Sequence, residues 1–179
     1  MNFKIGDIPV GLHTPFFVMA GPCVIESKTV CLDIAYRLLE ISRKTSIAII
    51  FKASFDKANR SSLHGFRGPG LKKGLDILSA VRQETTLPIM TDVHEAAQAG
   101  PAGRIVDCLQ IPAFLCRQTD LLCACAQTDK PINVKKGRRT GGPSADLRGR
   151  QISARRRSCR SLPRRRRRAS VRAGANSRA

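Results

Sequence analysis

Short apolar runs alternate with longer amphipathic stretches along most of this chain. Five runs rich in aliphatic, β-branched and aromatic residues cover positions 15–21, 47–53, 87–93, 107–112 and 131–136, and each ends in polar side chains. Runs of this length that are apolar on both faces are typical of strands in a parallel sheet. We therefore expect five strands.

Apolar residues at helical spacing fill the intervals between these runs. Ser27 is a suitable N-cap for a first helix, whose apolar face is predicted at Val30, Ile34, Leu38 and Ile41. A second helix follows the Gly-Pro-Gly breaker at 68–70, with Leu71, Leu75, Leu78 and Val81 on its apolar face. Gly100 and Pro101 interrupt the third helical stretch, which is predicted to be weak, and a fourth helix is expected at about 117–128.

Strands that alternate with helices predict an α/β fold, for which two architectures compete. An open doubly wound sheet carries a glycine-rich nucleotide turn after its first strand, but "AGPCVIES" at 20–27 has no such motif. A barrel instead collects chemical residues at the carboxyl ends of many strands. A complete barrel of eight strands needs roughly 250 residues, so five strands and four helices predict the N-terminal portion of a (β/α)8 TIM barrel.

Polar and ionisable side chains follow every one of the five predicted strands. They lie at or just beyond the carboxyl end of each predicted strand. They are Cys23 for the first strand, Lys52 and Lys57 for the second, Asp92 and His94 for the third, Gln110 for the fourth and Lys135 for the fifth. The stretch "KASFDKANRSS" at 52–62 adds further cations, hydroxyls and an amide. Such groups bind phosphates and carboxylates, so the pattern indicates an anion-binding barrel mouth.

Charge divides the chain into two parts. Residues 1–137 hold 17 Lys and Arg against 12 Asp and Glu, whereas residues 138–179 hold 15 Arg and a single acid, Asp146. The second part has no aromatic residue and few large aliphatic ones, so it cannot bury enough apolar surface to offset its ordering entropy. We expect a partial barrel domain over 1–137 and a disordered Arg-rich tail over 138–179.

Seven cysteines occur without a CxxC pair, and the sequence shows no signal peptide and no long apolar span. These features favour a cytoplasmic protein with reduced thiols and no membrane span.

Five motifs carry a resemblance to a known family. "AGPCVIES", "FKASFDKANRSSLHGFRGPGL", "TDVHE", "LQIPAFLCRQTDLL" and "INVKKG", in this order, closely resemble 3-deoxy-D-manno-octulosonate 8-phosphate synthases over residues 3–137. The resemblance implies a TIM barrel that condenses phosphoenolpyruvate with D-arabinose 5-phosphate and releases phosphate, on the route to the Kdo sugar of lipopolysaccharide. It also implies a homotetramer.

The resemblance implies roles for individual residues. The catalytic group would be Lys52, Lys57, Asp92 and Lys135, with the lysines on the carboxylate and phosphate of phosphoenolpyruvate and Asp92 near the reacting end of the pentose. The substrate-binding group would be Asn59, Arg60, Ser61, Gln110 and His94; a histidine satisfied at a strand end is the competing interpretation for His94. Cys23 would mark the metal-dependent form of the family, using a divalent ion such as Zn, Fe or Mn.

The chain departs from the family after Gly137. The family's remaining metal ligands are a histidine, a glutamate and an aspartate in a further stretch, but no His or Glu follows Gly137 here. We therefore expect a truncated, inactive chain, and we interpret the Arg-rich tail as a frameshifted translation of GC-rich DNA. The alternatives are a basic protein that binds nucleic acid or anionic membranes through the tail without sequence specificity, a misfolded product without function, and, within the fold, a 3-deoxy-7-phosphoheptulonate synthase. That relative carries a "KPRTS"-type loop where this chain has "KANRSS".

Overall fold

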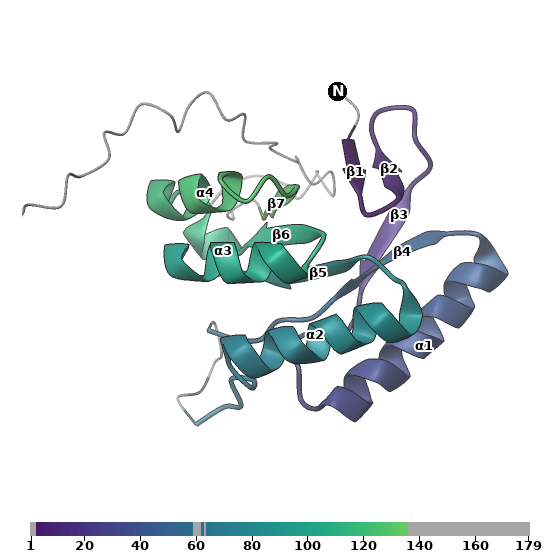
Figure 1. Cartoon of the computed structure of the whole chain (residues 1–179), viewed down its shortest axis with the longest axis horizontal. Coiled ribbons are helices and arrows are strands. Elements are labelled where there is room, and N and C mark those ends of the chain that lie inside the picture. The colour runs from purple at the N-terminus through teal and green to yellow at the C-terminus, as the bar shows by residue number, and fades with distance from the viewer. Residues whose placement is uncertain (1–2, 59–61, 63, 136–179) are drawn as a thin grey trace, which may run out of the picture.

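The computed structural model describes residues 3–58, 62 and 64–135. Two short strands, β1 (Phe3–Ile5) and β2 (Ile8–Val10), precede the strands β3 (Phe17–Ala20), β4 (Ala48–Lys52), β5 (Ile89–Asp92), β6 (Cys108–Ile111) and β7 (Ile132–Val134). The helices are α1 (Lys28–Thr45), α2 (Leu71–Thr85), α3 (Ala96–Ile105) and α4 (Thr119–Ala126), and Ala113–Leu115 form a 3-10 turn (Figure 1). Lys136 and the Arg-rich tail lie outside the described residues.

Strands β3 to β7 form one parallel sheet whose strand order is the order of the chain. Each step from strand to strand passes through one helix, so the sheet advances in a single direction, as in a barrel. Each of the five predicted runs contains one of these strands. The α/β class and the N-terminal portion of a TIM barrel, with five strands and four helices, are confirmed.

Helix α1 confirms the predicted cap and corrects part of the predicted apolar face. Ser27 Oγ accepts the Val30 backbone N–H at 3.1 Å, and the buried side chains on this helix are Cys31 and Ala35. Val30 is 38% exposed and Ile41 is 49% exposed, so these two positions do not belong to the buried face. The helix packs against α2 and β4, and this contact selects a narrower face than the apolar spacing suggested.

Helix α3 runs unbroken through Pro101, contrary to the interruption predicted there. Its start is stabilised because Glu95 and Gln98 form a capping box. Ala99 and Ala102 are completely buried against the rest of the protein. Tertiary packing therefore outweighs the missing backbone N–H of the proline, whose cost is about 3 kcal/mol in an isolated helix.

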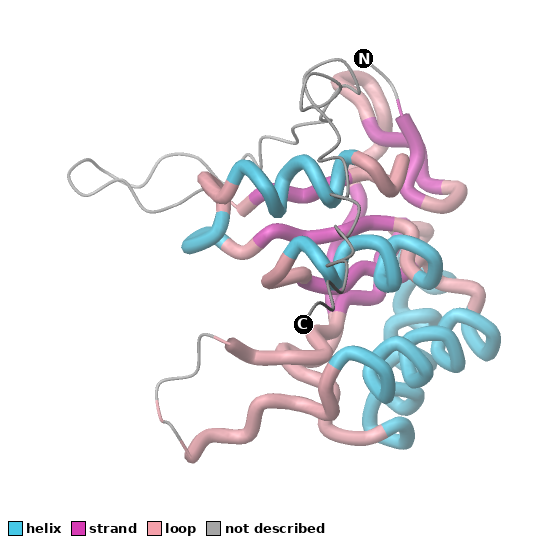
Figure 2. Tube along the Cα trace, turned by 60° about the vertical axis from the view of Figure 1, so that its left-hand side comes forward, coloured by secondary structure: helices cyan, strands magenta, loops and turns pink. Residues whose placement is uncertain are grey.

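The outer face of the sheet carries the main hydrophobic core. Ile49, Phe51, Ile89, Leu109 and Ile111 point to this side and pack with buried residues of all four helices. In Figure 2 the strands of this sheet lie in the centre among the helices, and the β1–β2 hairpin lies beside the N-terminus. Because side chains alternate along a strand, every second residue must point to the opposite, inner face.

The inner face has an apolar floor that a hairpin closes. Strands β1 and β2 pair antiparallel, and Ile5 and Val10 pack on Ile50, Met90 and Cys108 to form a second core cluster. This hairpin is an addition to the five predicted strands. Burial raises the pKa of the Cys108 thiol to about 12, with Asp107 adding to the rise and a backbone hydrogen bond from Asn133 opposing it.

An ion pair connects α2 to the segment before β6. Arg82 Nη2 lies 3.0 Å from Asp107 Oδ1, and Arg82 Nη1 donates to the Ile105 carbonyl at 3.0 Å. The other oxygen of Asp107 accepts the backbone N–H of Ile89 at 2.9 Å. Because Ile89 is fully buried, this carboxylate satisfies a donor that no water reaches.

Candidate functional site

Three polar side chains lie level with one another across the sheet. In the strand register, Asp92 of β5 pairs with Gln110 of β6, and Gln110 pairs with Asn133 of β7. Lys52 is the last residue of β4. It comes two residues after Ile50, which belongs to the inner cluster, so its side chain points to the same inner face. Adjacent residues at one level of a sheet point to the same face, so these side chains form a polar layer above the apolar floor. Here, polar layer means Lys52, Asp92, Gln110 and Asn133.

Hydrogen bonds join the polar layer into one chain. Lys52 Nζ lies 2.9 Å from Asp92 Oδ1, and Gln110 Nε2 donates to the same oxygen at 3.1 Å. Asn133 Nδ2 donates to Gln110 Oε1 at 3.0 Å. Three of these residues were predicted from the sequence. Asn133 was not, although a polar residue inside a short apolar strand is a visible signal.

Lys52 forms a largely buried ion pair with Asp92. Its side chain is 18% exposed and that of Asp92 is 14% exposed, and Lys52 Nζ also donates to Ser54 Oγ at 2.6 Å. An ammonium group has three donors, and these two contacts use two of them. The remaining donor can bind an anion while the pair stays intact.

Lys57 and Lys135 follow the carboxyl ends of β4 and β7 along the chain. Lys57 is half-buried in the connection from β4 to α2, and its backbone N–H donates to the backbone carbonyl of Arg67 at 2.6 Å. Arg67 in turn makes a bidentate pair with Asp56, with N–O distances of 2.8 and 2.6 Å. Lys135 is exposed directly after β7. The predicted residues Asn59, Arg60 and Ser61 lie outside the described residues.

His94 is half-buried beside the end of β5. Its ring meets Phe55 edge-on, with ring centres 6.1 Å apart and an interplanar angle of 88°. Its backbone N–H donates to Gln98 Oε1 at 2.9 Å. The ring atom Nδ1 is buried and has no hydrogen-bond partner among the described residues. The two interpretations of His94, a pocket residue and a histidine satisfied at a strand end, both stay predictions.

Cys23 is an exposed free thiol in the loop after β3. Gly21 holds this loop against β4, because at φ 150° a side chain there would overlap the carbonyl oxygen of Lys52. Ile25 continues the contact by donating its backbone N–H to Ser54 at 2.9 Å. The loop thus places Cys23 near the carboxyl end of β4.

The described residues do not fit a metal site. Within 3–58, 62 and 64–135 no three His, Cys, Asp or Glu side chains form a group that could hold an ion. A thiolate suits a borderline divalent metal, but a single exposed cysteine is one ligand and not a site. No chemical step is assigned to a metal here.

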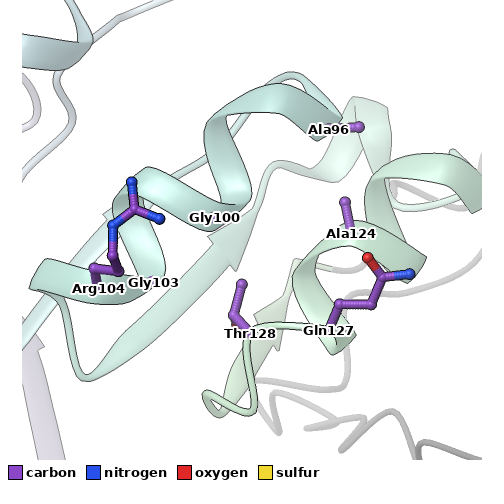
Figure 3. Close-up of a pocket in the computed structure, with 7 residues that line it drawn as sticks. All are labelled: Ala96, Gly100, Gly103, Arg104, Ala124, Gln127 and Thr128. Carbon is purple, nitrogen blue, oxygen red and sulfur yellow. The ribbon is translucent and has the colours of Figure 1, made fainter.

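A groove of about 400 Å³ lies elsewhere, between α3 and α4. Figure 3 shows its lining, which is Ala96, Gly100, Gly103, Arg104, Ala124, Gln127 and Thr128. The groove belongs to the helix layer and offers one ionisable side chain, Arg104. The polar layer therefore remains the candidate site.

No helix in the described ranges has the length and apolarity needed to cross a bilayer.

Comparison with known proteins assigns the chain to a family. The family described as the DAHP synthetase I family matches residues 2–149. The chain belongs to this family.

Two curated relatives of this family member are both named 2-dehydro-3-deoxyphosphooctonate aldolase. The protein of that name from Bordetella bronchiseptica is 55% identical over 134 residues, which is 75% of this chain and 47% of the relative. The one from Desulfatibacillum aliphaticivorans is 54% identical over 141 residues, 78% of this chain and 52% of the relative. The chain thus spans about half the length of the curated relatives it matches.

The name of these relatives is the alternative name of the synthase that the five motifs resemble, so the predicted resemblance is confirmed for this DAHP synthetase I family member. The family is one of enzymes, as predicted, and small molecules are the substrates that the relatives' name implies. The roles of individual residues stay predictions, as does the boundary between a partial barrel and an Arg-rich tail at 137 and 138.

Proposed function

We propose that the polar layer is the phosphoenolpyruvate side of a 3-deoxy-D-manno-octulosonate 8-phosphate synthase site. The observation that carries the proposal is the bonded set of Lys52, Asp92 and Gln110 at the carboxyl ends of three neighbouring strands. In a barrel this edge holds the chemistry. Relatives named 2-dehydro-3-deoxyphosphooctonate aldolase, at 54–55% identity, support the same reaction class.

The reaction joins a three-carbon enol phosphate to a five-carbon aldehyde. A carbon–carbon bond forms between the methylene carbon of phosphoenolpyruvate and the aldehyde carbon of arabinose 5-phosphate. Water supplies the oxygen at the former enol carbon, and inorganic phosphate leaves. The enzyme must therefore bind two anionic substrates and stabilise the negative charge that develops on the aldehyde oxygen.

The residues of this chain divide that work. Lys52, Lys57 and Lys135 hold the carboxylate and phosphate of phosphoenolpyruvate, with Gln110 beside them. Asp92 keeps Lys52 at the pocket wall and lies next to the reacting end of the pentose. His94, whose Nδ1 needs a partner, lines the same pocket. Asn59, Arg60 and Ser61 bind arabinose 5-phosphate in this proposal.

A divalent metal, a tetrameric assembly and a cytoplasmic location complete the proposal. Cys23 is the one proposed metal ligand, and Zn, Fe or Mn would suit a thiolate. Because residues 3–58, 62 and 64–135 form no metal site by themselves, the other ligands would have to come from outside these ranges. Beyond residue 135 the sequence offers Asp146 and Cys159 but no His or Glu. We therefore expect the 179-residue chain, taken alone, to bind phosphoenolpyruvate without turnover.

Binding and activity measurements on the purified 179-residue chain test this. Calorimetric titration with phosphoenolpyruvate should give binding that Lys52→Met weakens by about 50-fold or more, since charge-assisted contacts contribute about 1.5–3 kcal/mol each. Lys44→Met is the matched control, because Lys44 is an exposed lysine that pairs with Glu40 on α1; it should bind like the parent chain.

The outcomes separate the parts of the proposal. Absence of phosphoenolpyruvate binding to the folded parent chain, or equal loss in both lysine variants, would reject the site. Phosphate release from phosphoenolpyruvate plus arabinose 5-phosphate, with Mn²⁺ or Zn²⁺ added, would keep the site and reject the expected inactivity. Tighter binding of a four-carbon than of a five-carbon aldose phosphate would favour the seven-carbon synthase instead.

A further inference from the structure

We propose that Asn133 is a positioning residue that sets the orientation of the Gln110 amide and, through it, the geometry of the Lys52–Asp92 pair. The inference rests on the proposed function for the identity of the ligand. The hydrogen-bond geometry that supports it is independent of that function. Asn133 does not need to touch a substrate for this role.

Lys52 fixes the direction of every hydrogen bond in the polar layer. Its ammonium group can only donate, and a carboxylate can only accept. Asp92 Oδ1 therefore accepts from Lys52 at 2.9 Å and must also be met by a donor from Gln110, which is Nε2 at 3.1 Å. Gln110 then presents its oxygen to β7, and the partner at that position must be a donor.

Asn133 supplies that donor and is itself held in place. Its Nδ2 donates to Gln110 Oε1 at 3.0 Å. The same nitrogen lies 3.7 Å from Met19 Sδ and 4.0 Å from Met90 Sδ, and thioether sulfurs accept weakly but do not donate. Three acceptors thus face one amide nitrogen, so the asparagine amide has a single favourable orientation.

The burial of Gln110 makes this orientation important. Gln110 is only 3% exposed, so water cannot readily replace the hydrogen bonds that a wrongly oriented amide would lose. A flipped amide would place Oε1 against Asp92 Oδ1, which brings two acceptors together. The Nε2 hydrogens would then face Asn133 of β7 and no longer reach Asp92.

Two substitutions at position 133 test the role. Asn133→Asp keeps the shape but replaces the donor with an acceptor, so it conflicts with Gln110 Oε1. Asn133→Leu removes the donor and places an apolar side chain of similar size beside Met19 and Met90. It should therefore fold even if Asn133→Asp does not. Gln127→Leu is the control, because it removes an exposed amide at the groove between α3 and α4.

The first readout needs no ligand. Nitrogen-15 NMR follows the side-chain amide of Gln110, identified by its loss in Gln110→Met. In Asn133→Leu the Gln110 amide loses the hydrogen bond that holds its oxygen, so it should turn away from Asp92 more often. We therefore expect its hydrogens to exchange with solvent at least about tenfold faster, the factor that corresponds to one lost hydrogen bond. Their exchange rate should be unchanged in Gln127→Leu. An unchanged Gln110 signal in a folded position-133 variant would overturn the inference.

The second readout is phosphoenolpyruvate affinity as a function of pH. Asn133→Asp should weaken binding about tenfold or more near neutral pH, and the loss should shrink as the pH falls and the introduced carboxyl gains a proton that it can donate. A loss that does not depend on pH, or one that Gln127→Leu shares, would contradict a positioning role. If the parent chain binds no phosphoenolpyruvate, the proposed function fails while the NMR result still decides the role of Asn133.

Discussion

Substitutions in the Lys52–Asp92 pair can separate its contribution to folding stability from its contribution to phosphoenolpyruvate binding. Both side chains are more than four-fifths buried, and removal of one partner from a buried pair costs about 3–5 kcal/mol because the other charge is left uncompensated. The remaining exposure of this pair reduces the expected cost, so we expect about 2–3 kcal/mol for Lys52→Met or Asp92→Asn alone.

The double variant Lys52→Met with Asp92→Asn removes both charges together. The introduced amide can still accept the Gln110 N–H that now reaches Asp92 at 3.1 Å. Its free energy of unfolding should therefore lie within about 1 kcal/mol of the parent value, since a buried pair is often no more stable than a neutral replacement. The coupling between the two substitutions should amount to about 2 kcal/mol or more.

Urea denaturation followed by circular dichroism measures the four free energies of the cycle. Phosphoenolpyruvate titration of the same proteins measures binding. We expect the double variant to regain stability and not affinity, because its ligand-binding ammonium is gone. Additive effects on stability, with a coupling below about 0.5 kcal/mol, would refute the ion pair, and a double variant that binds phosphoenolpyruvate normally would refute its role in the site.

Three further predictions concern other parts of the fold. Asp107→Ala should lower the free energy of unfolding by about 1–3 kcal/mol because the buried Ile89 N–H loses its acceptor, whereas Asp107→Asn keeps an acceptor and should cost less than half as much in urea denaturation. With its pKa raised to about 12 by burial, Cys108 in the folded protein should react with iodoacetamide at about pH 8 roughly a thousandfold more slowly than an ordinary thiol, and the rate should rise about tenfold per pH unit up to about pH 12; mass spectrometry of the labelled peptide measures this. Gly21→Ala should lower the thermal midpoint and weaken phosphoenolpyruvate binding, because the new methyl group would overlap a carbonyl oxygen of β4; unchanged values of both would show that this close approach is not needed.

The strands and their order could be predicted because apolar runs report burial directly. Residues such as Ile49 to Phe51 are buried, and only a sheet covered on both faces accommodates them in succession. The hairpin at the N-terminus was missed, although Gly6 at φ 57° and Asp7 form a two-residue turn between Ile5 and Ile8 that carries a recognisable turn signal. Its strands of three residues are too short for periodicity to be convincing.

The site was predicted as a set of residues and not as a set of bonds. Lys52 and Asp92 are 40 positions apart, and their charges alone do not tell whether they meet. Asn133 escaped prediction because its importance comes from the register between β6 and β7, which places it level with Gln110. Such lateral neighbours become visible only when the strands are paired. The continuity of α3 through Pro101 was likewise a tertiary effect.

The β1–β2 hairpin that closes the inner floor has a consequence for the order of folding. Ile5 and Val10 pack in one cluster with Ile50, Met90 and Cys108, so the complete packing surface for the hairpin exists only after β4, β5 and β6 have come together. Contacts between residues this far apart in sequence form slowly. The hairpin should therefore dock late, after the sheet has formed, and the start of this chain should be among the last segments to gain protection from hydrogen exchange during refolding.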